Sequence, residues 1–344
     1  MEPQQPYQGF TPAAYGAAPV YIPPAPQQML RPLSTGEVLD RTMALYRRHF
    51  WMFAGIGAVP ALITTLSSTL NLIIVGNVPN PFMVGATRGA AQAVPPPQVS
   101  QMMLAQWYVL PFSVLFLVAY GISKAATVKA VSEISGGSAI SVLDAYRAVL
   151  HRWLRWSGIV LRQYWALLWP MILGMVLIAA AAGGGAVVFR NNPLLIGIAA
   201  FLGAILVLAG LVLGVMNYLR VALAEAAGVV EDLGVNASLR RSRVLVAGRK
   251  GRIFLAILLV YVLYMVAGGL QLPFLVMAQM SRGASHVLLL TGTLVVGFVA
   301  TSLVLPVASI ALTMFYIDER VRREGYDIEL LLQRRASTPP VPRV

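Results

Sequence analysis

Histidine is the side chain best suited to acid–base or metal chemistry near neutral pH, and this chain has three: His49, His151 and His286. None of them stands at the spacing from another histidine or a glutamate that helical zinc sites use. The chain has no cysteine, which excludes thiol catalysis and thiolate metal sites. Gly183–Gly185 lies in an apolar stretch without the Lys-Ser/Thr of a phosphate-binding loop. These patterns predict no catalytic residue, no metal site and no cofactor.

Polar side chains inside long apolar segments are the other candidates, because burying them in lipid is costly and they often mark substrate sites. Gln271 lies within Gly268–Pro273, where two glycines and a proline favour a break in the helix. Pro170 predicts a second break, and transporters often bind substrate at such positions. Two further polar residues close the fourth apolar segment. The possible intramembrane site therefore comprises Gln271, Pro273, Asn217 and Arg220.

The elements that would position these residues are six apolar segments, each about 20 residues or longer, as a membrane-spanning helix requires. They cover about 51–75, 104–123, 157–189, 194–219, 253–280 and 287–316. The chain is 58% hydrophobic and only 11% charged, against about 25% charged residues in soluble domains. Its mean hydropathy is +0.73. The segments are continuous rather than alternating, which predicts helices and not a barrel.

Charge is distributed very unevenly around these segments. Of the 26 Lys and Arg residues, 23 lie in the two terminal segments and the second and fourth gaps, if Arg162 just inside the third segment is included; the exceptions are Arg88, Arg190 and Arg282. All 13 Asp and Glu residues share the side of the basic majority. The positive-inside rule then predicts cytoplasmic termini in a bacterial-type inner (plasma) membrane. The net charge of +13 is spread over four segments next to the membrane, which favours anionic lipid rather than nucleic acid as a partner.

Short amphipathic helices are expected before the first, third and fifth spans. Val38-Leu39-Asp40 recurs as Val142-Leu143-Asp144, and the pairs Ser34–Glu37 and Ser141–Asp144 have the spacing of a capping box. Gly234 and Asn236 offer a turn and an N-cap for the third helix. We therefore predict an all-α polytopic membrane bundle of six transmembrane helices in three two-helix repeats, each preceded by a short amphipathic interfacial helix.

Basic clusters follow these amphipathic helices and are candidates for contact with lipid headgroups. They contain Arg47, Arg48, His49, His151, Arg152, Arg249, Lys250 and Arg252. The clusters either recognise anionic headgroups or a protein partner, or simply anchor the spans at the interface. Gly210 and Gly214 form a GxxxG pattern that favours close helix contact, either within the bundle or between subunits of a homo-oligomer. No acid is expected deep within a span, which disfavours a proton relay through carboxylates.

The chain divides into three parts. Residues 1–30 are rich in Pro and Gln and are expected to be a disordered cytoplasmic tail. Residues 31–332 form the six-span membrane domain, and 333–344 a flexible C-terminal tail. The pairs Asp318–Arg322 and Glu319–Arg323 are expected to extend the sixth helix until Gly325 ends it.

The ends of the membrane domain resemble a known family. Arg31–Arg41 (RPLSTGEVLDR), Leu45–Phe50 (LYRRHF) and Phe315–Asp327 (FYIDERVRREGYD) are similar to the opening and ending of the glycerophosphoryl diester phosphodiesterase membrane-domain family. The resemblance covers about residues 31–332. Some members carry a phosphodiesterase barrel with His-Arg-Gly and Glu-x-Asn motifs and a divalent metal. This chain has neither motif and resembles the stand-alone membrane domain.

The sequence favours one functional hypothesis over two others. The first is a non-enzymatic membrane scaffold or accessory protein whose basic cytoplasmic face contacts anionic lipid headgroups or a protein partner. The second is a transporter or flippase-like carrier with a site at the breaks near Pro170 and Gly268–Pro273. An intramembrane enzyme is the third. A water-filled path through the membrane would favour the carrier, and a dry bundle the scaffold.

Overall fold

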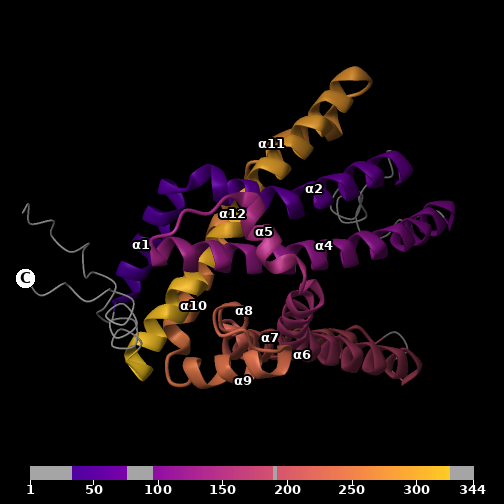
Figure 1. The fold of residues 1–344 in the computed structure, drawn as a ribbon. Coiled ribbons are helices and arrows are strands. Elements are labelled where there is room, and N and C mark those ends of the chain that lie inside the picture. The colour runs from indigo at the N-terminus through magenta and orange to yellow at the C-terminus, as the bar shows by residue number, and fades with distance from the viewer. Residues whose placement is uncertain (1–32, 76–95, 189–191, 326–344) are drawn as a thin grey trace, which may run out of the picture. The chain divides into compact units, whose positions relative to one another are not determined.

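The computed structural model describes residues 33–75, 96–188 and 192–325, and all regular structure in these ranges is helical (Figure 1). The two predicted tails lie outside the described residues. The helices are α1 (Thr35–Arg48), α2 (Phe50–Val75), α4 (Pro96–Gly136), α5 (Val142–Leu150), α6 (Trp153–Val188), α7 (Pro193–Val221), α8 (Ala224–Val230), α9 (Val235–Val246), α10 (Lys250–Gly269), α11 (Leu272–Met280) and α12 (Ala284–Glu324).

Six segments of these helices are long and apolar enough to cross a membrane. They cover 50–73, 110–136, 153–179, 197–230, 250–280 and 284–324. The fourth combines α7 with α8, and the fifth combines α10 with α11. Each overlaps one of the predicted apolar segments, which confirms the six-span helical bundle. The grouping into three sequence repeats stays a prediction.

The buried core lies at one end of the long helices. It takes the first part of α2, α6 and α10 and the last part of α4, α7 and α12, together with α1, α5, α8 and α9. Figure 1 shows the short helices gathered among these parts of the long ones. We call this region the core end, and the opposite parts of the long helices the far end. In α12, for example, every buried residue lies at or after Ser302.

Glycines set the closest helix contacts. A Cβ atom at Gly214 would lie 2.2 Å from the carbonyl oxygen of Leu167, and one at Gly210 would lie 2.8 Å from that of Pro170. The GxxxG pattern of α7 therefore faces α6 within the bundle, rather than another subunit. Gly57 has the same role between α2 and α12, since its Cβ would lie 2.1 Å from the carbonyl oxygen of Ser302.

Most of the predicted helix ends are confirmed. Ser34 and Glu37 form a reciprocal capping box at the start of α1, and the Ser141 hydroxyl accepts from the Asp144 amide at the start of α5. The N-cap of α9 is Gly234, so the expectation that Asn236 caps this helix was wrong. Gly325 ends α12 in the left-handed conformation with φ 62°.

The amphipathic helices α1 and α5 present their apolar faces differently. In α1, Leu39, Met43 and Tyr46 pack against the core, and the Tyr46 hydroxyl donates to the Leu303 carbonyl in α12 at 2.9 Å. In α5, Leu143 and Leu150 are exposed, while the small Ala145 and Val149 are buried. Only α5 therefore offers large apolar side chains to a surrounding membrane.

Arg252 ties the start of α1 to α12. Its guanidinium donates to the Leu33 carbonyl at 2.8 Å, to Asp318 at 2.9 Å and to Glu319 at 3.0 Å. The Leu33 amide also donates to Asp318 at 2.7 Å. The predicted pairs Asp318–Arg322 and Glu319–Arg323 are present at 3.0 and 3.8 Å. This network fixes both ends of the described chain at the core end.

Candidate functional site

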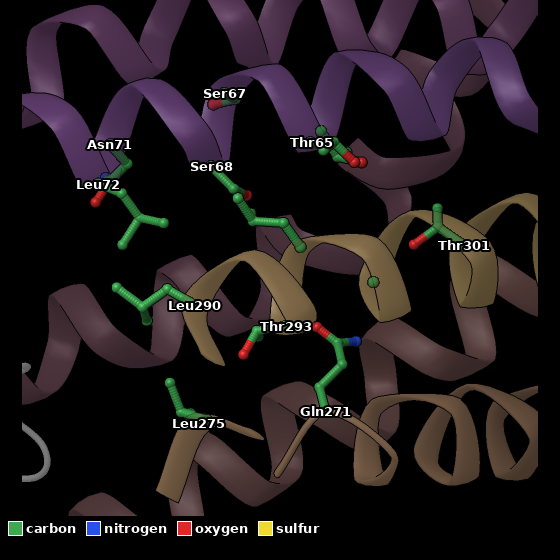
Figure 2. Close-up of a pocket in the computed structure, with 13 residues that line it drawn as sticks. Thr65, Ser67, Ser68, Asn71, Leu72, Gln271, Leu275, Leu290, Thr293 and Thr301 are labelled. Carbon is green, nitrogen blue, oxygen red and sulfur yellow. The ribbon is translucent and has the colours of Figure 1, made fainter. Parts of the chain in front are cut away.

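A polar groove lies at the far end, between α2, the α10–α11 junction and α12. Its volume is about 510 Å³. Hydroxyl and amide side chains make up most of its lining: Thr64, Thr65, Ser67, Ser68, Asn71, Gln271, Thr293 and Thr301. In Figure 2 these side chains come from α2 on one side and from the α10–α11 junction on the other, with α12 between them. No charged side chain lines the groove within the described residues.

The stripe on α2 follows from helical spacing. Thr64, Ser68 and Asn71 stand four and three residues apart, so they share one face of the helix. The hydroxyls of Thr64 and Thr65 donate to the Ala61 carbonyl at 2.8 and 2.9 Å, which leaves their oxygen lone pairs to accept from a ligand. Ser68 and Asn71 form no side-chain hydrogen bond within the part of the chain that the structure describes.

Gln271 enters the groove at the predicted helix break. α10 ends at Gly269 and α11 begins at Leu272, so the backbone turns at Leu270 and Gln271. The Gln271 amide lies against α12, where a Cβ at Gly297 would be 3.0 Å from its Oε1 atom. Among the described residues the side chain has no hydrogen-bond partner. The break therefore delivers a free amide to a segment that spans the membrane.

The groove has a specific chemical character. An unpaired hydroxyl or amide facing lipid costs free energy, which water or a polar ligand in the groove would offset. The lining offers hydrogen-bond donors and acceptors without charge, so it suits a neutral molecule rich in hydroxyl groups. Leu294 and Gly297 of α12 also line the groove, and Leu72, Leu275 and Leu290 make one side of it apolar.

The other predicted intramembrane residues lie elsewhere. Pro273 occupies the first turn of α11 and is exposed. Arg220 donates to Asn217 at 3.5 Å on α7, and neither residue lines the groove. The predicted break near Pro170 was wrong, because α6 continues through this proline from Trp153 to Val188. Of the two predicted breaks, only Gly268–Pro273 interrupts a helix.

Three of the eight candidate headgroup residues form ion pairs with acidic residues of the protein. Arg152 pairs with Asp232, which also pairs with Arg155 at 2.7 Å. Arg249 lies 3.4 Å from Glu319, and Arg252 binds the acids of α12 described above. These guanidinium groups hold helices together at the core end.

The remaining five candidates have no acidic partner within the described residues: Arg47, Arg48, His49, His151 and Lys250. Arg47 and Arg48 are exposed in the last turn of α1, where positive charge is favourable. Trp51 follows them and is 83% exposed, a typical position for a tryptophan at a membrane interface. This part of the surface combines unpaired basic charge with an exposed aromatic ring.

The sequence analysis missed a buried ion pair. Glu225 in α8 is 3% exposed and pairs with Lys124 of α4, which is 5% exposed. Lys124 also donates to the side-chain oxygen of Gln163 at 3.2 Å, and Gln163 donates to the Val221 carbonyl at 2.9 Å. Both charged residues fall within membrane-spanning segments. Glu225 lies near the end of the segment 197–230, so the expectation that no acid lies deep within a span stays a prediction.

The fold and its six apolar helical segments define an integral, multi-pass membrane protein of the α-helical class. No protein-family model, curated protein or solved structure matches the chain.

Proposed function

We propose that the protein is a transporter or flippase-like carrier, and that the polar groove is its substrate site. One observation carries the proposal: a row of hydroxyl and amide groups without charged neighbours lines a groove inside membrane-spanning helices. The row begins near the middle of α2 at Thr64 and continues to Asn71. Ser68, Asn71 and Gln271 have no side-chain hydrogen-bond partner within the described residues, and a purely scaffolding role does not require such groups.

The proposed substrate carries a neutral, hydroxyl-rich group. The uncharged lining favours hydrogen bonding over ion pairing, and Gln271 supplies both a donor and an acceptor. A polyol headgroup on a lipid and a free polyol present the same chemistry to the groove. The apolar wall formed by Leu72, Leu275 and Leu290 favours the lipid.

The break between α10 and α11 supports movement of a short helix during transport. Gly268 and Gly269 precede the break, and a Cβ at either position would meet no atom within 4 Å. α11 packs against α12, the helix that also lines the groove. In this proposal α11 pivots at Leu270 and Gln271 and opens the groove.

The natural absence of cysteine allows a direct test of water in the groove. Ser68→Cys and Thr293→Cys should react with a water-soluble maleimide in proteoliposomes. Leu66→Cys is the matched control, because Leu66 is exposed on α2 but does not line the groove. We expect at least tenfold faster labelling at 68 and 293 than at 66. Equal, slow labelling at all three positions would contradict a water-accessible groove and therefore the proposed substrate site.

A second assay separates the two substrate sources. Proteoliposomes are tested for translocation of a fluorescent glycosyl diacylglycerol, whose sugar headgroup is neutral and rich in hydroxyls, and for uptake of radiolabelled glycerol. Lipid translocation without glycerol uptake indicates a flippase-like carrier, and the reverse indicates a solute transporter. Absence of both activities from an otherwise folded protein counts against transport of this class.

The second candidate function is a membrane scaffold or accessory protein, favoured by the exposed Arg47 and Arg48 beside Trp51 and by Lys250 at the start of α10, none of which has an acidic partner within the described residues. Anionic lipid headgroups of the cytoplasmic leaflet are the proposed ligands, with a protein partner or a second copy as the alternatives. Native mass spectrometry should show fewer retained phosphatidylglycerol molecules after charge reversal at these three positions. Arg282→Glu, in the exposed turn before α12, is the control. Equal retention in both variants would exclude the lipid contact.

We further propose a bacterial-type inner membrane and cytoplasmic termini, supported by the uneven distribution of Lys and Arg. Ser138 is exposed after the end of α4, and Ser285 is exposed in the first turn of α12, so the two lie between spans that belong to opposite sides of this topology. An impermeant thiol reagent added to intact cells should label Ser285→Cys and spare Ser138→Cys. The opposite pattern would invert the topology.

Membership of the glycerophosphoryl diester phosphodiesterase membrane-domain family is proposed from the terminal phrases quoted above. The lack of the barrel's His-Arg-Gly and Glu-x-Asn motifs supports a protein without this enzymatic activity. The purified protein should release no glycerol phosphate from glycerophosphodiesters with Mg²⁺ or Ca²⁺. Metal-dependent turnover that survives repurification would overturn this part.

A further inference from the structure

A second cavity lies among α4, α6, α7, α10 and α12. Its volume of about 580 Å³ is within the range of about 300–1,000 Å³ typical of ligand pockets. The lining is mostly apolar, but it includes five tyrosines: Tyr120, Tyr164, Tyr218, Tyr261 and Tyr264. None of the residues that line the polar groove lines this cavity. The two are separate sites.

One wall of the cavity belongs to the surface that faces lipid. Phe254, Leu258 and Tyr261 line the cavity and are exposed, and all three lie in the α10 span. A molecule dissolved in the bilayer can therefore enter between helices without crossing water. The surrounding solvent for this site is hydrocarbon, which selects an occupant with a long apolar part.

The buried Lys124–Glu225 pair lies behind the tyrosines. The Lys124 ammonium is 5.4 Å from the centre of the Tyr120 ring, and Tyr120 and Tyr164 lie side by side with ring centres 6.3 Å apart. Glu225 faces Lys124 with Oε2, while its other oxygen, Oε1, has no hydrogen-bond partner within the described residues. Neither residue lines the cavity, so the pair acts on an occupant only through its two charges behind the tyrosine rings.

We propose that this cavity binds a neutral, single-chain lipid whose hydroxyl-bearing end faces the tyrosines and the Lys124–Glu225 pair. The apolar lining holds one hydrocarbon chain, and the tyrosine hydroxyls bond the oxygens of the uncharged end. Because Lys124 and Glu225 balance each other's charge, an anionic end gains no net attraction and loses its hydration. The ligand class is that of a monoacylglycerol or long-chain alcohol, and not that of a fatty acid.

The inference is independent of transport through the polar groove. The cavity uses residues of α4, α6 and α7 that take no part in the groove. Bound lipid here is equally compatible with a carrier and with a scaffold. Failure of the groove experiments therefore leaves this proposal standing, and its own failure leaves the groove standing.

The test is photo-crosslinking of a diazirine-bearing monoacylglycerol to the purified full-length protein in detergent micelles. Ala308→Phe fills the cavity, because Ala308 lines it and is only half buried. Val262→Phe is the control, because it introduces the same phenylalanine side chain on α10 at an exposed position outside the lining. We expect at least tenfold less crosslinking in Ala308→Phe and wild-type crosslinking in Val262→Phe. The labelled peptides should come from α7 and α10.

Competition and a second variant make the result decisive. Unlabelled monoacylglycerol should displace the probe at least tenfold more effectively than a fatty acid with the same chain. In the double variant Tyr164→Phe/Tyr264→Phe, the probe should remain bound while this preference falls towards one. Crosslinking that persists in Ala308→Phe, or fatty acid that competes equally in the wild type, would overturn the proposal. If Ala308→Phe does not fold, the competition ratio in the wild type and the double variant decides the question.

Discussion

The core end and the far end of the same helices differ in whether their polar side chains have hydrogen-bond or ion-pair partners. At the core end, Lys124, Gln163 and Arg252 each bind partners from other helices. At the far end, Gln271 and Ser68 line a groove and have no partner within the described residues. The difference assigns separate roles: paired polar groups hold helices in place, and unpaired ones are available to a ligand.

The largest effect is expected from dividing the buried pair at the core end. Lys124→Met leaves the Glu225 carboxylate buried without its cation, which should cost about 3–5 kcal/mol of unfolding free energy. Lys124→Met/Glu225→Leu removes both charges and should recover most of that loss. SDS titration in mixed micelles measures both. A double variant as unstable as the single one would mean that the pair does not set stability at this end.

The next largest loss of unfolding free energy is expected from disturbing the close packing of α6 and α7. Gly214→Ala should destabilise the protein by about 1–3 kcal/mol, because the new Cβ would lie 2.2 Å from the Leu167 carbonyl oxygen. Gly197→Ala on the same helix meets no atom within 4 Å and should be neutral or slightly stabilising. The same titration compares them, and equal stability of the two variants would contradict the α6–α7 contact.

At the far end the effect should be on function and not on stability. Gln271→Leu removes the amide from the groove and should lower translocation about tenfold, equivalent to about 1.4 kcal/mol in activation free energy. Its unfolding free energy should stay near that of the wild type, because the amide has no partner to lose. Val276→Leu, at an exposed position on α11 outside the groove, should leave both unchanged. Lost stability in Gln271→Leu would place Gln271 with the structural polar groups.

The smallest effect concerns pH at the contact between α1 and α12. Burial raises the pKa of Tyr46 from 10.0 to about 12, while its hydroxyl donates to Leu303. The unfolded chain loses this proton first, so the stabilising contribution is complete below pH 10 and is lost as pH rises to 12. Tyr46→Phe should cost about 1 kcal/mol at neutral pH and should flatten the decline between pH 10 and 12. Burial also raises the pKa of Tyr146 to about 12, so part of the decline should persist.

Sequence patterns predicted the features that depend on local physics. Apolar length located the six spans, and the spacing of Ser34 with Glu37 located the start of α1. Gly325 was expected to end α12, and the break at Gly268–Pro273 was expected in the fifth span. Each of these signals is contained in a few consecutive residues, which is why the sequence alone reveals it.

The parts that depend on distant residues were not predictable. Glu225 follows the apolar run of α7, and no pattern in the sequence indicates that it pairs with the distant Lys124 of α4. Gln271 was recognised as polar, but Thr64 and Ser68 looked like ordinary small residues of a membrane helix. Only the packing of α2 beside α12 brings them to one groove. Pro170 failed as a break because proline alone does not end a helix in a membrane.

The hydrogen bond from the Leu33 amide to Asp318 also constrains the order in which the protein assembles. The two residues lie at opposite ends of the described chain, and Arg252 of the fifth span donates to both. A nascent chain therefore cannot lock α1 until the sixth span has left the ribosome and entered the bilayer. Until that moment α1 lacks its contacts with α12. The Leu33–Asp318 hydrogen bond can form only after the sixth span is made, so a chain arrested after five spans would lack this contact of α1.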